Sequence, residues 1–180
     1  MKKKAVAAMW VFVASLVFGI LTINTALANT PLLDRTLPLT DLALELKTPQ
    51  SIAHYMWRHF IFEQDQRNFG QSEYWQSPEE FLKTGKGDCE DFAIFARELL
   101  HLNGINAFLL NIYGPGYGHT ICVFMENGKY NAIDGTNVEN YQADNLPDLM
   151  TKINPFWNEG AVVAPSKTSS SGVILQTIPR

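Results

Sequence analysis

Hydrophobic residues recur at helical spacing directly after Cys89, one of the two cysteines in this chain of 180 residues. The positions that follow one helix face are Phe92, Ala93, Phe95, Ala96, Leu99 and Leu100. Because Asp88 is a preferred N-cap, this pattern predicts a helix whose first residue is Cys89. Gly85 and Gly87 come just before it and predict a flexible approach to the thiol.

Two helices are predicted upstream of that pattern. Thr48 is followed by Pro49, which suits the first helical position, and by an apolar stripe at Ile52, Met56 and Phe60. The run Ser77-Pro78-Glu79-Glu80 is a capping box and opens a second, short helix. A further short helix is favoured from Thr40 through Lys47, whereas the polar residues 64–72 predict a loop.

Strand patterns follow the Cys89 helix. The apolar run 105–113 is bounded by glycines and predicts a buried strand, and 114–118 predicts a mobile glycine-rich loop. Residues 119–126 and 129–134 flank Asn127-Gly128, which is a strong hairpin signal. The pattern then weakens, although 146–153 is compatible with a short helix.

The predicted hairpin brings a histidine close to an aspartate. A two-residue turn pairs Glu126 with Lys129, so side-chain alternation places His119 and Asp134 on one face as diagonal neighbours. A carboxylate there can bind one imidazole nitrogen and fix the tautomer. Cys122 is expected on the opposite face, which argues against a disulfide with Cys89. The alternative is that His119 and Asp134 are ordinary residues of a strand end and a turn.

The two ends of the chain differ in composition from its centre. Three lysines, an apolar run from Ala5 to about Leu21 and then Ala26-Leu27-Ala28 predict a signal peptide over 1–28, with an uncleaved anchor as the alternative. We expect one domain over 29–163, then a linker and C-terminal tail over 164–180, of which 173–180 is compatible with a last strand. The protein is then periplasmic or secreted, or membrane-anchored at its N-terminus.

Charge narrows the choice of partners. Removal of the signal segment takes away three lysines and no acid, and changes the formal net charge from −4 to −7. An acidic domain without a basic run is a poor ligand for nucleic acid. We therefore expect a protein or peptide substrate, no nucleic acid, and no membrane contact beyond the signal segment.

Several sequence blocks together resemble a known family. G-K-G-D-C-E-D-F-A, preceded by W-Q-S-P-E-E-F and followed by G-H-T-I-C-V-F and Y-N-A-I-D-G-T, resembles the bacterial transglutaminase-like cysteine proteinases, a branch of the transglutaminase-like superfamily. The resemblance covers about residues 49–136. It implies an α+β fold with a papain-like or transglutaminase-like core, in which an antiparallel sheet packs on the helix that starts at the catalytic cysteine. It also implies Cys89 as nucleophile, His119 as general base and acid, and Asp134 as the orienting group.

Metal binding is the point on which the resemblance and the residues disagree. Some periplasmic members of the family bind calcium through acids beside the cysteine, which here match Asp88 and Glu90. The residues themselves are explained by capping and by the helix dipole, and the sequence shows no compact loop of six or more oxygen ligands. We therefore expect no cofactor, with calcium near Asp88 and Glu90 as the alternative. Trp75 and Gln76 are candidates for shaping the acyl site or supporting an oxyanion.

The leading hypothesis is an exported thiol-dependent hydrolase or acyltransferase that acts on peptide or side-chain amide bonds, in particular a cysteine peptidase. The alternatives are a non-catalytic peptide-binding module of the same fold and a transglutaminase that cross-links protein amines. We expect the helix start and a nearby His119 to lower the pKa of Cys89 below the ordinary value of about 8.5, because acids at exposed positions oppose this only weakly.

Overall fold

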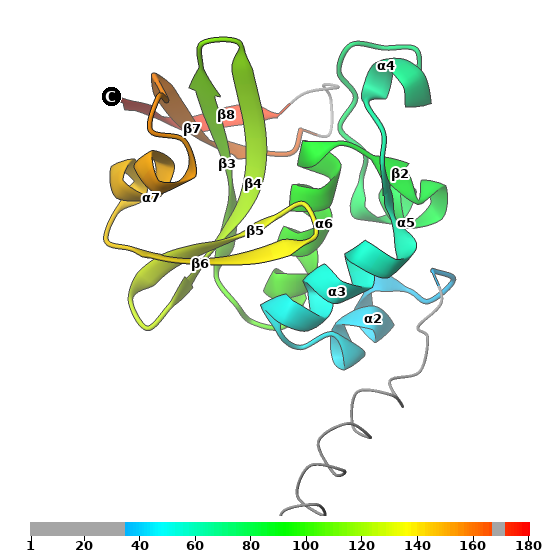
Figure 1. Cartoon of the computed structure of the whole chain (residues 1–180). Coiled ribbons are helices and arrows are strands. Elements are labelled where there is room, and N and C mark those ends of the chain that lie inside the picture. The colour runs from blue at the N-terminus through cyan, green and yellow to red at the C-terminus, as the bar shows by residue number, and fades with distance from the viewer. Residues whose placement is uncertain (1–34, 167–171) are drawn as a thin grey trace, which may run out of the picture. The chain divides into compact units, whose positions relative to one another are not determined.

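The structure is a computed structural model that describes residues 35–166 and 172–180 (Figure 1). Its helices are α2 (Leu39–Glu45), α3 (Pro49–His59), α4 (Asp65–Asn68), α5 (Pro78–Thr84), α6 (Cys89–Leu102) and α7 (Leu146–Ile153). Its strands are β1 (Ile61–Phe62), β2 (Lys86–Gly87), β3 (Ala107–Gly114), β4 (Tyr117–Glu126), β5 (Lys129–Asp134), β6 (Asn137–Ala143), β7 (Glu159–Ala164) and β8 (Val173–Pro179). The predicted signal peptide lies outside the described residues. Within them, no helix has both the length and the apolar character that a membrane crossing requires.

The predicted helix starts are confirmed by their capping contacts. Thr48 caps α3, where its Oγ1 accepts the Ser51 N–H at 3.1 Å. At the start of α5 the Glu80 N–H donates to Ser77 Oγ at 3.2 Å, and the Ser77 N–H donates to Glu80 Oε2 at 2.8 Å. The helix α6 begins at Cys89 with Asp88 as its N-cap. Local sequence signals therefore fix the position of the thiol at a helix terminus.

Six strands form one antiparallel sheet with the order β6-β5-β4-β3-β7-β8. The predicted hairpin register is confirmed, because Glu126 pairs with Lys129. The strand β8 pairs with β7, so the sheet continues past residue 163, where we expected the domain to end. Of the two alternatives for the C-terminal segment, the strand is the one observed.

The expected glycine-rich loop before His119 is much shorter than predicted. Gly114 pairs with Tyr117, so β3 and β4 extend through the segment and leave only Pro115 and Gly116 in the turn. Proline suits the first corner of such a turn, and Gly116 supplies the positive φ, 65°, of the second. The start of β4 is thus held by a closed hairpin.

Five short elements were not predicted. The helix α4 lies within residues 64–72, which we expected to be a loop, and β1 and β2 are only two residues long. The strands β6 and β7 fall in the region where the pattern weakens, and their side chains alternate poorly between buried and exposed positions, which removes the usual strand signal.

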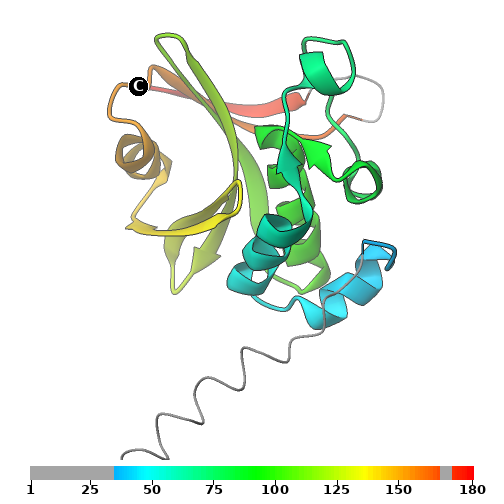
Figure 2. The same ribbon diagram turned by 45° about the vertical axis from the view of Figure 1, so that its right-hand side comes forward.

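The two faces of the sheet are covered by different helices. Leu149 and Met150 of α7 pack with Ile121 and Val123 of β4 in one apolar cluster. Figures 1 and 2 show α6 on the opposite side of the sheet from α7. The α+β architecture that we expected, with an antiparallel sheet packed on the helix that starts at Cys89, is confirmed.

Aromatic packing anchors α6 on its other side. The rings of Phe60 and Phe81 lie 4.2 Å apart, and the ring of Phe95 lies 4.9 Å from that of Phe60. All three side chains are buried. Because fully burying such a side chain contributes roughly 1.5–3 kcal/mol, this cluster holds the helix firmly and hence the position of Cys89.

Candidate active site

The backbone before Cys89 is held in place rather than flexible, contrary to our expectation. Lys86 and Gly87 form β2 and pair with Ile61 and Phe62. A Cβ added at Gly87 would lie 2.1 Å from Asp91 Oδ2. Gly87 is therefore required because the carboxylate of the next helical turn packs directly on its Cα.

Cys89 lies against the first half of β4. The Thr120 backbone forms a hydrogen bond with the thiol. Strand pairing between β4 and β5 begins only at Cys122. The first residues of β4 are therefore not paired with β5 where they approach the start of α6. The Thr120 side chain is fixed in turn, since its Oγ1 donates to Asn111 Oδ1 at 2.9 Å. The strand residue whose backbone contacts the thiol is thus the immediate neighbour of His119.

His119 and Asp134 are in direct contact. The Nε2 atom of His119 lies 2.7 Å from Asp134 Oδ1, and the two side chains are 23 % and 31 % exposed. His119 is the third residue of β4 and Asp134 is the last residue of β5. The contact occupies Nε2 and leaves Nδ1 as the nitrogen that can exchange a proton with a partner.

The prediction of a lowered pKa for Cys89 is wrong. Burial raises the pKa of this thiol to about 12, and the neighbouring carboxyl of Glu90 adds to the rise. We expected the acids around Cys89 to be solvent-exposed, but Glu90 is 4 % exposed and Asp91 is fully buried. Without solvent to screen them, these acids outweigh the helix dipole.

The buried acids form a cluster at the start of α6. Single oxygen atoms of Asp65, Asp88 and Asp91 all lie within 4.8 Å of one another, and ligand atoms of Asp88, Cys89 and Glu90 form a second such group. Asp65 is only 2 % exposed. The Oδ1 atoms of Asp65 and Asp88 are buried and have no hydrogen-bond partner among the described residues.

Burial disfavours the charged forms of Asp65, Glu90 and Asp91. It raises the pKa of Asp65 to about 6 and that of Asp91 to about 7, and it also raises the pKa of Glu90. A buried acid without a partner is costly unless it is protonated or binds a cation. Clustered carboxylate oxygens suit a hard cation such as Ca²⁺, so these residues fit the metal that the family resemblance implies.

Gln76 and Trp75 have their polar atoms committed elsewhere. Gln76 is buried, and its Nε2 donates both to Asp91 Oδ2 at 2.6 Å and to the Lys86 carbonyl at 2.8 Å. Its Oε1 accepts the Thr84 hydroxyl at 2.7 Å. The Trp75 indole N–H donates to Glu73 Oε1 at 2.6 Å. Gln76 therefore organises the backbone around Cys89, and neither side chain has a free donor for an oxyanion.

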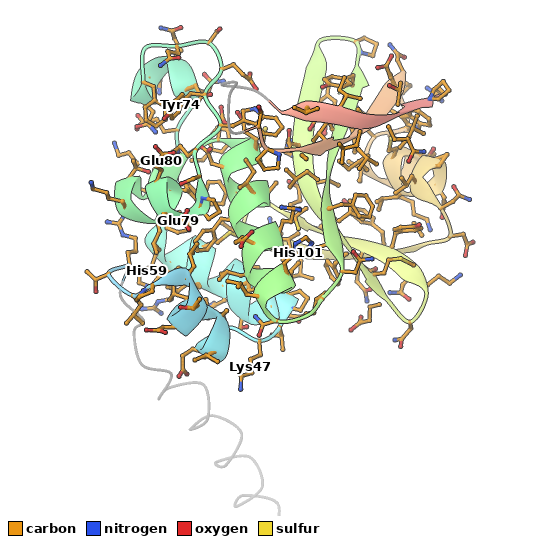
Figure 3. The ribbon with its side chains drawn as sticks, turned by 180° about the vertical axis from the view of Figure 1, so that it is seen from behind. Lys47, His59, Tyr74, Glu79, Glu80 and His101 are labelled. Atoms are coloured by element: carbon orange, nitrogen blue, oxygen red, sulfur yellow. The ribbon has the colours of Figure 1, made fainter. Side chains whose placement is uncertain are left out.

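The remaining histidines lie in other contacts. His101 is in the last turn of α6, where its Nε2 lies 2.7 Å from the Ala107 carbonyl, and the His59 ring stacks on Tyr55 with centroids 4.4 Å apart (Figure 3). His54 packs beside Trp57. These contacts give the three histidines packing and structural roles.

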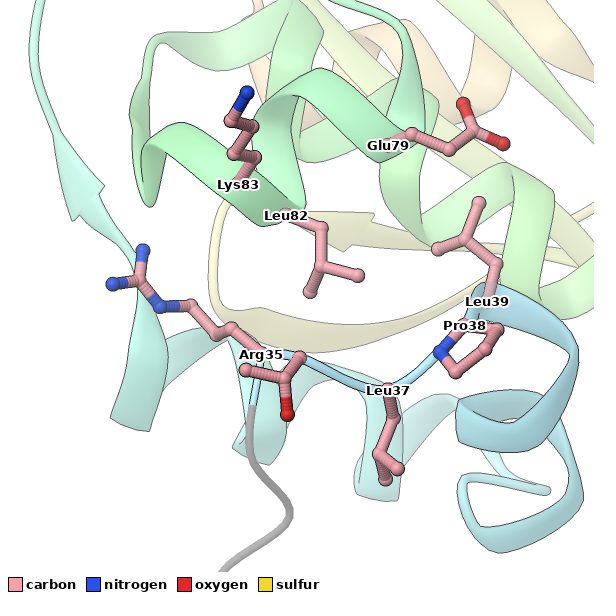
Figure 4. A pocket seen from close by; sticks show the side chains of 8 residues that line it. Arg35, Leu37, Pro38, Leu39, Glu79, Leu82 and Lys83 are labelled. Atoms are coloured by element: carbon pink, nitrogen blue, oxygen red, sulfur yellow. The ribbon is translucent and has the colours of Figure 1, made fainter.

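Two further features lie outside the site. Cys122 is a free thiol and is completely buried, and burial raises its pKa. A groove of about 590 Å³ lies between the segment 35–39 and α5, and Figure 4 shows Leu82 and Lys83 on its wall. None of the three predicted catalytic residues lines this groove.

Sequence reasoning missed two residues near the thiol. Asp65 gave no signal, because it belongs to a polar stretch 24 positions before Cys89 that we expected to be a loop. Tyr117 lies two residues before His119, and strand alternation places both on one face. Their ring centroids are 5.9 Å apart. The alternation rule that found Asp134 would also have found this tyrosine.

Comparisons with solved structures give distant similarities. LapG of Legionella pneumophila is 22 % identical with a TM-score of 0.44, over 56 % of this chain and 62 % of that chain. Its calcium-bound form is 23 % identical with a TM-score of 0.45, over 61 % and 66 %, and its EGTA-treated form is 21 % identical with a TM-score of 0.48, over 76 % and 77 %. This chain thus spans about three fifths of the first LapG structure. No curated protein matches it.

A family comparison is more decisive, because it covers more than half of the sequence. The model of the bacterial transglutaminase-like cysteine proteinases matches residues 35–128. This range includes the capping box of α5, the start of α6 and the whole of β4, and therefore Cys89 and His119, but it ends before β5 and Asp134. The chain belongs to the bacterial transglutaminase-like cysteine proteinase family.

Proposed function

We propose that this protein is an exported cysteine peptidase that uses Cys89, His119 and Asp134 on peptide or side-chain amide bonds. The observation that carries the proposal is the 2.7 Å contact between His119 Nε2 and Asp134 Oδ1, one residue from the strand position whose backbone binds the Cys89 thiol. A nucleophile, a base and a group that orients the base are the minimum set for acyl transfer through a thiol.

The roles of the three residues follow from their contacts. Asp134 holds Nε2 of His119, which leaves Nδ1 to accept the thiol proton. The thiolate attacks the carbonyl carbon, and the N–H groups at the start of α6 stabilise the oxygen that becomes negative. His119 then protonates the leaving amine, and water hydrolyses the thioester with His119 again acting as base.

A metal fits the same site. Asp65, Asp88, Glu90 and Asp91 are the residues that would hold Ca²⁺ beside the thiol. When bound, the ion supplies positive charge that neutralises these carboxyls and so favours the thiolate. The known LapG structures include calcium-bound and EGTA-treated forms. We therefore extend the proposal to a calcium-dependent enzyme, in place of the expectation of no cofactor.

Export and domain limits complete the proposal. The N-terminal pattern of lysines, apolar residues and Ala26-Leu27-Ala28 supports a signal peptide over 1–28 and a periplasmic or secreted domain after it. A protein or peptide substrate fits an acidic domain of this family. The experiment is N-terminal sequencing of the protein from periplasmic and membrane fractions, where a mature start at Asn29 supports cleavage and an intact Met1 supports an anchor.

Activity is tested with labelled casein in the presence of calcium. We expect cleavage by the wild type, loss with Cys89→Ala and with His119→Ala, and retention with Cys122→Ala as the matched cysteine control. Parallel incubation with dansylcadaverine tests amine transfer, and incorporation without cleavage would indicate a transglutaminase. Casein binding without turnover, unchanged by Cys89→Ala, would indicate a peptide-binding module.

A further inference from the structure

Acyl chemistry at Cys89 needs hydrogen-bond donors for the substrate oxygen, and the structure limits which side chains can supply one. Removing a single such donor from a serine protease lowers kcat by about 10²–10³-fold. Gln76 and Trp75, the two candidates from the sequence, have no free donor. The Thr120 backbone bond goes to the thiol itself. If a side chain donates to the substrate oxygen, it is therefore neither Gln76 nor Trp75.

Tyr117 is placed to be that side chain. It is the first residue of β4, held by the closed Pro115-Gly116 turn, and its ring lies 5.9 Å from that of His119. It is half-buried and packs against the apolar cluster on the α7 face of the sheet. Among residues 35–166 and 172–180, its hydroxyl forms no hydrogen bond. A hydroxyl in this position is available to a ligand.

Electrostatics connect this phenol to two groups of the site. Burial raises the pKa of Tyr117, and the charges of Asp134 and of Cys89 raise it further. The hydroxyl therefore lies within electrostatic range of both the nucleophile and the orienting acid. It also remains protonated across the working pH range, as a hydrogen-bond donor must.

We infer that Tyr117 is a further catalytic residue, whose hydroxyl donates a hydrogen bond to the carbonyl oxygen of the bound substrate. This inference rests on the proposed function of Cys89. In the acylation step the thiolate forms a C–S bond and the carbonyl π electrons move to oxygen, where the Tyr117 O–H and the helix-start N–H groups stabilise the negative charge. The oxygen then re-forms the carbonyl as the leaving group departs with the C–N or C–O bonding electrons, and a thioester remains on Cys89.

Two thiol reagents distinguish stabilisation of the oxyanion from an effect on the thiol itself. Acylation by p-nitrophenyl acetate passes through an oxyanion, whereas alkylation by iodoacetamide displaces iodide at a saturated carbon and forms none. We expect Tyr117→Phe, which keeps the ring beside His119, to slow acylation of Cys89 by about 10–100-fold in the presence of calcium. Its alkylation rate should stay within about twofold of the wild type, because the thiolate and His119 are unchanged.

Tyr130→Phe is the matched control, since Tyr130 is a half-buried tyrosine that packs on the same apolar cluster at the other end of the hairpin. It should change neither rate, and thermal unfolding should confirm that both variants are folded. Wild-type acylation in Tyr117→Phe overturns the role of Tyr117 alone. An equal loss of acylation and alkylation also overturns it, because the residue would then act on the thiol. A wild-type protein that p-nitrophenyl acetate does not acylate at Cys89 overturns the proposed function, and the Tyr117 role with it.

Discussion

The thiol of Cys89 donates a hydrogen bond to Oε2 of Glu90, 3.2 Å away, within the first turn of α6. A helix start normally favours an anion, but this one also carries a buried carboxyl beside the nucleophile. Burial and Glu90 together keep the proton on sulfur. The first turn therefore restrains the reactivity that the helix dipole would promote.

Replacing Glu90 with glutamine should increase thiol reactivity in EGTA. The substitution keeps the shape of the side chain but removes the carboxyl that helps to raise the pKa of Cys89. Each pKa unit is a tenfold change in thiolate fraction, so we expect iodoacetamide alkylation to be faster by up to about tenfold at fixed pH. Glu98→Gln, one turn from the end of the same helix, is the control and should have no effect. A slower reaction in Glu90→Gln would contradict this account.

Calcium should stabilise the fold through Asp65. A ligand that binds only the folded state at 100 times its Kd adds about 2.7 kcal/mol, which raises Tm by several degrees in a domain of this size. We expect this rise for the wild type in differential scanning calorimetry. Asp65→Asn should reduce it strongly, because Asp65 supplies a buried oxygen without a partner. Asp144→Asn, an exposed acid on the surface, should leave it intact.

The same acids make stability fall as pH rises when calcium is absent. Burial raises the folded-state pKa of Asp65 to about 6 and of Asp91 to about 7, above the values near 4 of the unfolded chain. The folded state then binds more protons than the unfolded state, so the free energy of unfolding is highest below pH 4 for these groups and decreases from pH 4 through pH 7. Because one pKa unit corresponds to about 1.4 kcal/mol, we expect urea unfolding in EGTA to show a loss of up to about 7 kcal/mol over this range. A flat profile in EGTA would refute this linkage, and calcium should flatten it.

The sequence predicted the parts of the fold that depend on short-range signals. The caps at Thr48 and Ser77, the start of α6 at Cys89 and the Asn127-Gly128 hairpin all rest on residues within a few positions of one another. Side-chain alternation in that hairpin was enough to bring His119 to Asp134 across 15 positions. Local geometry therefore gave the arrangement of two of the three proposed catalytic residues.

What the sequence could not supply was the environment of the thiol. The burial of Glu90 and Asp91, and the approach of Asp65, depend on how α4 and the segment before α5 fold over the start of α6. No local pattern reports that packing. The error in the predicted pKa of Cys89 came from treating these acids as exposed, since the same acids in water would have had little effect.

Gln76 should be important for stability rather than for catalysis directly. Its buried amide joins Asp91, the Lys86 carbonyl and the Thr84 hydroxyl. Gln76→Ala removes one hydrogen-bond partner from each of these groups, although each keeps another, and a buried hydrogen bond contributes about 0.5–1.5 kcal/mol. We expect the free energy of unfolding in urea to fall by at least about 2 kcal/mol, against a change within about 0.5 kcal/mol for the exposed Gln50→Ala. Equal stability of the two variants would show that water replaces the amide.

The orienting role of Asp134 can be separated from any structural role. Asp134→Asn preserves size but can present an N–H to His119 Nε2, which favours the wrong tautomer and prevents Nδ1 from accepting the thiol proton. Because general acid–base catalysis contributes about 10²–10⁴-fold, we expect casein cleavage to fall by at least 10²-fold while Tm changes little, since the pair is partly exposed. The control is Asp148→Asn, at a half-buried aspartate, which breaks a surface ion pair with Lys152.

If Asp134→Asn retained full activity, His119 would be oriented by another group, and the contact with Asp134 would be only structural. If it lost activity together with the fold, as judged by Tm, the 2.7 Å contact would be a stabilising pair at the end of β5 and the orienting role would need a different residue.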